Sequence, residues 1–285
     1  MKIKFATLAM LCLLSSITPH QITWTAIGDS ITYLNNHIDE TGNRISSGYM
    51  TKVSAQYPNI KYINQGHNGW TVTGIAKEIE NLGLIKSDIY SVFLGTNDWW
   101  QGLPLGTFND YKNNTGLKST YGAYRIIVDK IRSLNPTAKI ILITPMQRAD
   151  FVYLFDAHNN AYGSYKPKNG QNLSQFADVV KVIGNYEHFT VIDLYYQSGI
   201  MVKNAVKFKR LKDSVSGLYQ NIKYPDWIRK PFHPGIDEYP YPVDAIDYTY
   251  DGLHPSDKGH QLIADMLIKV FKKDRYVVSE SPANN

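Results

Sequence analysis

Cysteine is almost absent from this sequence of 285 residues, since Cys12 is the only one. A chain with one cysteine forms no internal disulfide and holds no metal through cysteine pairs. Cys12 also lies in a short apolar segment at the amino terminus that we expect to be removed, so the mature protein would contain no thiol. Attachment of a lipid to Cys12 is the alternative, but Leu11 is bulkier than the small residue that usually precedes such a cysteine.

Long hydrophobic runs are absent after that amino-terminal segment. Lys2 and Lys4 precede an apolar run over residues 5–14, and serines follow at 15–16. This order is typical of a secretory signal peptide, and the run is about half of the roughly 20 residues that a membrane span needs. We therefore predict a signal peptide over residues 1–21, export to the periplasm or the cell exterior, and no integral membrane segment in the mature chain.

Dense clusters of positive charge and phosphate-binding glycine motifs are also absent. The chain has 30 Lys and Arg against 25 Asp and Glu, a formal net charge of +5, and its basic residues are scattered. Nucleic-acid binding usually needs clustered positive charge, and nucleotide binding usually needs a Walker or dinucleotide glycine motif. His37, His67 and His233 do not have the spacing of metal ligands. We therefore expect no nucleic-acid partner, no phosphate-cradling loop and no metal site built from these histidines.

The sequence does have the composition of a globular protein, with 43% hydrophobic and 19% charged residues. Short apolar runs alternate with segments of helical spacing, in the order expected of a βαβ protein with a parallel sheet. This alternation predicts one domain over residues 22–285, an α/β fold with three α/β/α layers, and ligand chemistry at the carboxyl ends of the strands. The expected strands are 22–27, 60–64, 89–94, 139–144 and 190–194, and the expected helices are 49–57, 74–81, 120–134, 174–186 and 256–272.

Residues 195–250 do not follow this alternation. The segment contains many tyrosines, together with Trp227, Phe232 and several prolines. Loops of this length in compact domains are usually functional or disordered, and so many aromatic residues argue against disorder. We interpret the segment as an aromatic-rich insertion over the active face.

Two segments that are far apart in the sequence supply the parts of a nucleophilic site. Ser30 follows Gly28 and Asp29 where the first strand ends, which is a suitable place for a nucleophile. A serine hydroxyl needs a base within hydrogen-bond reach and a third group that orients the base. Asp251 and His254 provide both, because a turn at Gly252 would let the carboxylate reach Nδ1 and leave Nε2 to face the serine.

Two further loops offer donors for a developing oxyanion. Residues 64–71 follow the second strand, and Gly69 within them presents a backbone N–H that no side chain blocks. Residues 95–98 follow the third strand, and the side-chain amide of Asn97 is a donor. Such donors stabilise the transition state of acyl transfer by a few kcal/mol each. Serine, glycine, asparagine and histidine therefore reach one face of the sheet from four loops.

Each element also has a purely structural interpretation. Gly-Asp-Ser is a common turn, Asp98 could cap a helix, and His254 alone could be a surface histidine. The alternative serine motif of hydrolases, Gly-x-Ser-x-Gly, is absent, because Ser30 is the only serine with a glycine two positions before it. The joint occurrence of the four loops favours a functional site.

The four segments resemble the sequence blocks of the GDSL-type esterases and lipases, also called SGNH hydrolases, and they occur in the family's order. The resemblance implies that Ser30 is the nucleophile, that His254 is the base and that Asp251 is its partner. It implies an oxyanion hole made by the N–H of Ser30, the N–H of Gly69 and the side chain of Asn97. It also implies a flavodoxin-like five-stranded parallel sheet and hydrolysis of acyl esters without a metal or cofactor.

Departures from the family pattern are few. Ile31 replaces the leucine of the family name, and Trp70 fills a position that is usually small or polar. Neither change affects a residue that carries the chemistry.

The leading hypothesis is a secreted serine esterase that removes acetyl or other short acyl groups from a small molecule or a glycan. Trp70, Trp99 and Trp100 follow the two oxyanion loops, and we predict that they bind substrate, because flat aromatic faces stack on sugar rings. A lipase acting on longer acyl chains is the alternative. A carbohydrate-binding protein without turnover is a further alternative, which the presence of Ser30 and His254 disfavours.

Overall fold

A computed structural model describes residues 20–274 and residue 276 of the chain. Residues 1–19 of the predicted signal peptide, with Cys12, lie outside the described residues. The strands are β1 (Ile22–Gly28), β2 (Ile60–Gly66), β3 (Ile89–Phe93), β4 (Lys139–Ile143), β5 (Phe151–Tyr153), β6 (Asp156–Ala161), β7 (Thr190–Ile192), β8 (Lys209–Lys212) and β9 (Tyr219–Ile222).

The helices are α1 (Ser30–Tyr33), α2 (Tyr49–Gln56), α3 (Val72–Lys77), α4 (Thr96–Trp100), α5 (Phe108–Lys112), α6 (Thr120–Leu134), α7 (Leu173–Glu187), α8 (Leu194–Gln197), α9 (Val202–Ala205) and α10 (Asp257–Lys273). Short 3₁₀ helices are η1 (Leu34–Asn36), η2 (Ile38–Thr41), η3 (Asp226–Arg229) and η4 (Val243–Ala245). The five strands and five main helices expected from the sequence are all present, with bounds that differ by a few residues.

Five strands form one parallel sheet in the order β2-β1-β3-β4-β7, which is the strand order of flavodoxin-like folds. The predicted α/β/α sandwich is thus confirmed. Gly28 at the end of β1 pairs with Gly66 of β2 on one side and with Phe93 of β3 on the other. Three strands therefore end at the same level, and the loops that follow them start side by side.

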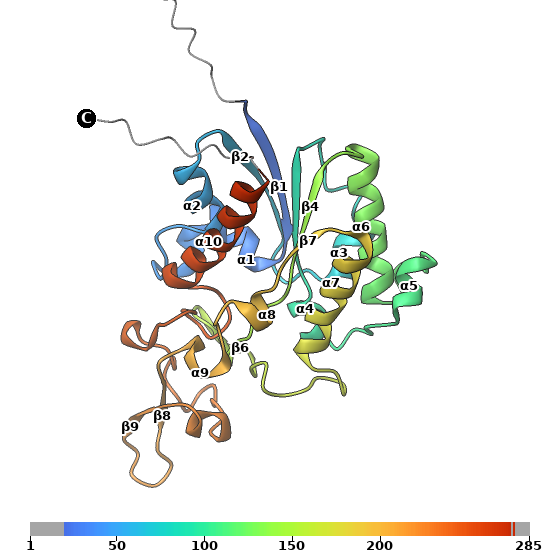
Figure 1. The fold of residues 1–285 in the computed structure, drawn as a ribbon. Coiled ribbons are helices and arrows are strands. Elements are labelled where there is room, and N and C mark those ends of the chain that lie inside the picture. The colour runs from blue at the N-terminus through green and yellow to red at the C-terminus, as the bar shows by residue number, and fades with distance from the viewer. Residues whose placement is uncertain (1–19, 275, 277–285) are drawn as a thin grey trace, which may run out of the picture.

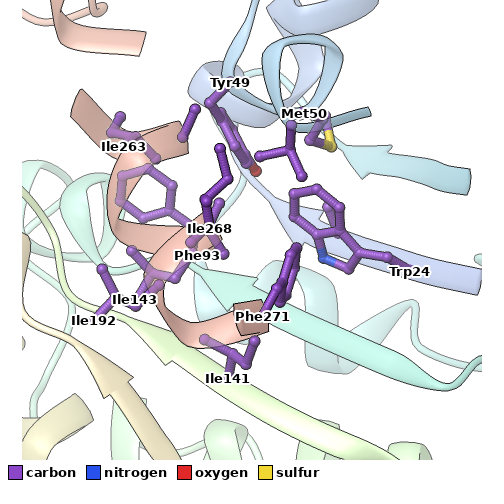
Figure 2. Close-up of a cluster of buried hydrophobic side chains, with 14 of the residues drawn as sticks. Trp24, Tyr49, Met50, Phe93, Ile141, Ile143, Ile192, Ile263, Ile268 and Phe271 are labelled. Atoms are coloured by element: carbon purple, nitrogen blue, oxygen red, sulfur yellow. The ribbon is translucent and has the colours of Figure 1, made fainter. Parts of the chain in front are cut away.

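Helices cover both faces of this sheet (Figure 1), with α2 and α10 on one face and α3, α6 and α7 on the other. Figure 2 shows the first of these apolar layers, in which Trp24 of β1 packs edge-on against Phe271 of α10 with ring centroids 5.4 Å apart. Trp24 is fully buried, and its indole N–H donates to Ser91 Oγ at 2.9 Å. Burial on both faces explains why the central strands β3 and β4 are mostly apolar rather than strictly alternating.

The last helix, α10, holds the carboxyl-terminal part of the chain against β1 and α2. Ser256 caps it by accepting a hydrogen bond from the N–H of Gly259, as the sequence predicts. Ile263, Leu267 and Phe271 recur at a spacing of four residues and are fully buried in the apolar layer. This packing fixes the start of α10, which lies directly after the loop that carries His254.

Residues 195–250, here called the accessory lobe, extend beyond the carboxyl ends of the sheet strands (Figure 1). The lobe has a small apolar cluster that includes Trp227 and Tyr241. The cluster also contains Ala149 and Val152 from the segment after β4, so the lobe packs on the antiparallel β5–β6 hairpin. The aromatic residues of the lobe therefore serve largely as a second core.

Within residues 20–274 and 276, no helix combines the length and the apolar character that crossing a bilayer requires.

Candidate active site

Ser30, His254 and Asp251 form a continuous hydrogen-bonded chain. Ser30 is the first residue of α1, and its Oγ lies 2.8 Å from Nε2 of His254. Nδ1 of His254 lies 2.6 Å from Oδ2 of Asp251, which is 1% exposed. The other carboxylate oxygen of Asp251 accepts hydrogen bonds from the N–H groups of Leu253 and His254. A carboxylate held in this way keeps the proton of the imidazole on Nδ1 and leaves Nε2 to accept the proton of the serine.

The turn that carries His254 depends on a glycine. Gly252 has a φ of +90°, a backbone conformation that residues with a side chain rarely adopt. A Cβ at this position would lie 1.8 Å from the carbonyl oxygen of Asp150. The loop after β4 thus packs against the turn that carries His254, and the close approach excludes any side chain at position 252.

The imidazole of His254 is also held by aromatic rings. Tyr250 stacks on it with ring centroids 5.8 Å apart, and Phe151 of β5 meets it edge-on at 5.5 Å. His254 is 7% exposed. Its orientation is therefore set by packing as well as by Asp251.

The two loops expected to donate to an oxyanion are joined to each other by hydrogen bonds. Nδ2 of Asn97 donates to the carbonyl of Trp70 at 3.0 Å, and Nε2 of Gln101 donates to the carbonyl of Gly69 at 3.1 Å. Gly69 has a φ of +73°, so the turn itself requires glycine. Ser30, Gly69, Asn97 and His254 line one cavity of about 430 Å³.

Two buried carboxyl groups lie beneath this cavity. Asp29 accepts a hydrogen bond from the N–H of Ile31 and so caps α1, and burial raises its pKa to about 6. Asp98 accepts from the N–H of Val72 at 2.9 Å, and burial raises its pKa to about 7. The sequence alone allowed Asp98 to be a simple helix cap. In the structure, its carboxyl group ties the loop after β2 to α4.

The three tryptophans lie in different places, and only Trp100 lines the cavity. Trp99 is fully buried, and its indole N–H donates to the carbonyl of Gln171 at 3.1 Å. The expectation that Trp99 contacts substrate is wrong, because its ring points into the protein. Trp70 stacks on His67 with ring centroids 4.4 Å apart and packs against the second apolar layer. The carbonyl of Trp70, rather than its ring, supports the site.

One wall of the cavity comes from the segment after β4, which was not predicted to belong to the site. Arg148 follows β4, and Phe151, Tyr153, Asn159 and Ala161 belong to the β5–β6 hairpin. No motif marks these residues. Their position after the fourth strand of a parallel sheet was nevertheless a usable signal, because the loops at the carboxyl ends of such strands meet at the ligand site.

The sequence and the fold are similar to those of known proteins. A family model described as GDSL-like Lipase/Acylhydrolase family matches residues 26–262. No curated protein matches the sequence.

Among solved structures, a possible lipase from Chitinophaga pinensis is 59% identical to this chain with a TM-score of 0.89, and the match covers 90% of this chain and 100% of that one. A protein from Lactobacillus plantarum is 19% identical with a TM-score of 0.60, over 91% of this chain and 99% of that one. The second likeness concerns the fold alone.

Proposed function

Because this ester-hydrolysing enzyme belongs to the GDSL-like lipase/acylhydrolase family, we propose that it is an exported serine esterase with a Ser30–His254–Asp251 triad. Its proposed reaction is the removal of acetyl or other short acyl groups from a carbohydrate. The observation that carries the proposal is the chain of hydrogen bonds from Ser30 Oγ through His254 to Asp251, at 2.8 and 2.6 Å.

In the first half of the proposed reaction, His254 Nε2 takes the proton of Ser30 as Oγ attacks the ester carbonyl carbon. The carbonyl oxygen becomes an oxyanion, which the N–H groups of Ser30 and Gly69 and the amide of Asn97 stabilise. The ester C–O bond then breaks, and the alcohol leaves with the proton from His254. The acyl group remains on Ser30.

In the second half, a water molecule replaces the alcohol. His254 takes a proton from this water, and the resulting hydroxide attacks the acyl carbon. The bond between the acyl carbon and Ser30 Oγ then breaks, and His254 returns the proton to Oγ. The carboxylic acid leaves, and the enzyme returns to its starting state. No step of this scheme uses a metal or a cofactor.

The composition of the cavity wall supports a short acyl group and a sugar. Trp100, Phe151, Tyr153 and Tyr250 contribute aromatic rings, and Asn68, Asn97, Gln101 and Asn159 contribute amides. Aromatic faces stack on the apolar faces of sugar rings, and amides bind sugar hydroxyls. A tunnel for a long acyl chain is expected to have more aliphatic side chains than Leu34, Ala161 and Leu253 supply.

A lipase acting on longer acyl chains is the second candidate, because the 59% identical relative carries the description of a possible lipase. A preference for acyl chains of about eight carbons or more would favour it over the short-acyl esterase. A binding protein without turnover would not need the hydrogen bond between Ser30 and His254, which therefore favours an enzyme.

Export rests on the predicted signal peptide at residues 1–21. It is tested by expressing the full chain in a bacterial host and sequencing the amino terminus of the protein recovered outside the cytoplasm. Recovery of the uncleaved chain in the cytoplasm alone would contradict export.

The test of the reaction is the Ser30→Ala variant on p-nitrophenyl esters from acetate to palmitate. Loss of the nucleophile should lower kcat by at least about ten-thousandfold, because the members of a triad act as a unit. Ser133→Ala is a matched control, because Ser133 is exposed on α6 and far in sequence from the site. The wild type should prefer acetate.

Near-wild-type turnover by Ser30→Ala, with the control also unchanged, would overturn the assignment of the nucleophile. Circular dichroism of the variant shows whether the fold is intact, so that a loss of turnover is attributed to chemistry.

A further inference from the structure

Arg148 is a buried cation in the wall of the catalytic cavity. It is 1% exposed, and Nη2 donates to the carbonyl of Tyr162 at 2.7 Å. Its Nε is buried and has no hydrogen-bond partner among the residues that the structure describes. Its guanidinium carbon lies 5.1 Å from the ring centroid of Trp99 and 6.0 Å from that of Trp100. Burial lowers the pKa of Arg148 to about 10, so the group is charged at neutral pH.

The two carboxylates whose charges act most strongly on Arg148, those of Asp150 and Asp251, already have partners. Asp150 pairs with Lys209 at 2.6 Å, and Asp251 pairs with His254 at 2.6 Å. None of the ion pairs in the described part of the chain includes Arg148. An unpaired buried charge is costly, and a planar guanidinium matches a carboxylate through two parallel hydrogen bonds.

A second cavity of about 570 Å³ adjoins the catalytic one, because Trp100, Phe151 and Ala161 line both. Lys166 and Arg229 also line the second cavity. Aromatic and cationic groups therefore continue outward from the nucleophile.

A third cation lies beside this path, since Nζ of Lys168 is 4.4 Å from the ring centroid of Trp100. Lys166, Lys168 and Arg229 form no ion pair with any carboxylate among residues 20–274 and 276. Three unpaired cations around one aromatic surface point to a ligand with negative charge.

Acidic residues along this path are few. Asp150 is the acidic residue in the lining of the second cavity, and it is held by Lys209. Glu40 is the acidic residue in the lining of the first, and it accepts a hydrogen bond from Tyr33 at 2.8 Å. His37 lies 3.3 Å from the same carboxylate. Each of these carboxylates thus has partners of its own, whereas none of the four cations pairs with a carboxylate in the part of the chain that the structure describes.

We propose that Arg148 binds a carboxylate on the alcohol part of the ester, and that Lys166, Lys168 and Arg229 bind further carboxylates of the same molecule. The substrate is then an acylated acidic oligosaccharide, such as one built of uronic acids. This inference rests on the proposed ester hydrolysis and narrows its substrate class. Arg148 would also bind a carboxylate on the acyl part of the ester, and a separate probe distinguishes the two positions.

The first experiment compares a charged and a neutral ester with the same acyl group. The probes are meta-acetoxybenzoate and meta-acetoxybenzamide, each corrected for its spontaneous hydrolysis. The wild-type kcat/KM should favour the benzoate by at least about tenfold, mainly through KM, and Arg148→Met should reduce the ratio to about one. Arg148→Lys keeps the charge and should restore part of the ratio.

A monosuccinate ester of meta-hydroxybenzamide places the carboxylate on the acyl part instead. A preference for this probe over the acetate, with no preference between the benzoate and the benzamide, would overturn the assignment to the alcohol part.

The second experiment does not depend on a buried substitution or on turnover. Binding of unacetylated oligogalacturonate and of neutral xylo-oligosaccharide is measured by tryptophan fluorescence on the full chain at low salt. The wild type should bind the acidic oligosaccharide at least about tenfold more tightly, and this preference should weaken as salt rises. The double variant Lys166→Met with Arg229→Met replaces exposed side chains and should lose most of the preference.

Lys269→Met, which removes an exposed lysine of α10, is the matched control and should keep the preference. Equal or weaker binding of the acidic oligosaccharide, or an equal loss in the control, would overturn the inference while leaving ester hydrolysis intact. Absence of turnover with all ester probes, with the binding preference present, would instead overturn the proposed reaction and keep the anion site.

Discussion

The sheet and the segment that anchors the accessory lobe each bury an aspartate beside the active site, but they stabilise it differently. Asp98 lies on α4 at the sheet edge, where its carboxyl group is fully buried and accepts from the backbone N–H of Val72. Asp150 lies at the root of the lobe, where it accepts from Tyr165 and Gly163 and pairs with the buried Lys209 at 2.6 Å. Among the described residues Asp98 forms no ion pair, whereas Asp150 pairs with Lys209.

The difference shows how each region joins its loops. Asp98 ties the loop after β2 to α4, and burial raises its pKa to about 7, so its charge depends on pH near neutrality. The Asp150–Lys209 pair ties the lobe to the segment whose carbonyl group packs on Gly252. We therefore expect the stability of the contact between Asp98 and the loop after β2 to depend on pH. The stability of the lobe should depend instead on the Asp150–Lys209 ion pair.

The largest effect on stability is expected from Lys209→Met. The substitution leaves Asp150 buried without its cation, and breaking a buried pair in this way costs about 3–5 kcal/mol of unfolding free energy. The control is Arg125→Met, which removes a partly exposed ion pair with Asp129 at 2.8 Å and should cost about 0.5 kcal/mol. Urea unfolding measures both. Equal destabilisation of the two variants would mean that the lobe is not held by its buried pair.

Next in size is the pH dependence that Asp98 contributes. Its pKa is about 7 in the folded protein, whereas an aspartate in an unfolded chain has a pKa of about 3.9. The folded state therefore binds more protons between these values. The stability from this group is present in full below about pH 4 and is lost as pH rises through about 7, by at most about 4 kcal/mol.

The variant Asp98→Asn tests this contribution, because the amide does not titrate and keeps an acceptor for Val72. Its unfolding free energy should fall less steeply than that of the wild type between about pH 4 and about pH 7. Ser133→Ala, which removes no titratable group from the exposed surface of α6, is the control and should run parallel to the wild type. A parallel curve for Asp98→Asn would show that the carboxyl group is ionised throughout.

The smallest free-energy effect, about 3 kcal/mol in the transition state, is expected from Asn97→Ala. Removal of one oxyanion donor should lower kcat by roughly a hundredfold with little change in KM. Asp98→Asn should change kcat far less, because its carboxyl group supports the loop and does not line the cavity. Steady-state kinetics on p-nitrophenyl acetate compares the two. A loss confined to KM would make Asn97 a binding residue.

The fold was predictable from the sequence where hydrophobic patterning decides the structure. The central strands β1, β3 and β4 are buried on both faces, so their apolar runs stand out, and α10 shows its apolar stripe and its Ser256 cap. The β5–β6 hairpin was missed, because Asp156–Ala161 is a polar strand that is largely exposed and has little apolar alternation. The pair between Asp150 and Lys209 was also beyond reach, since 59 positions separate two charged residues that no local pattern connects.

The candidate site was predictable as far as backbone position controls it. Ser30, Gly69, Asn97 and His254 follow strand ends or adjoin a glycine turn, and they line one cavity. The tryptophans were less predictable, because a helix turns neighbouring side chains in different directions. Trp99 therefore points into the core and Trp100 into the cavity, although they are adjacent in α4.

The most direct test of the central claim, that His254 activates Ser30 as the nucleophile, is covalent labelling with an organophosphate ester followed by peptide mass spectrometry. The reagent phosphorylates an activated serine and then resists hydrolysis. We expect one adduct, on Ser30, which forms at the same rate as esterase activity is lost, and no adduct in His254→Ala. An adduct on another serine, or full activity after Ser30 is modified, would contradict it.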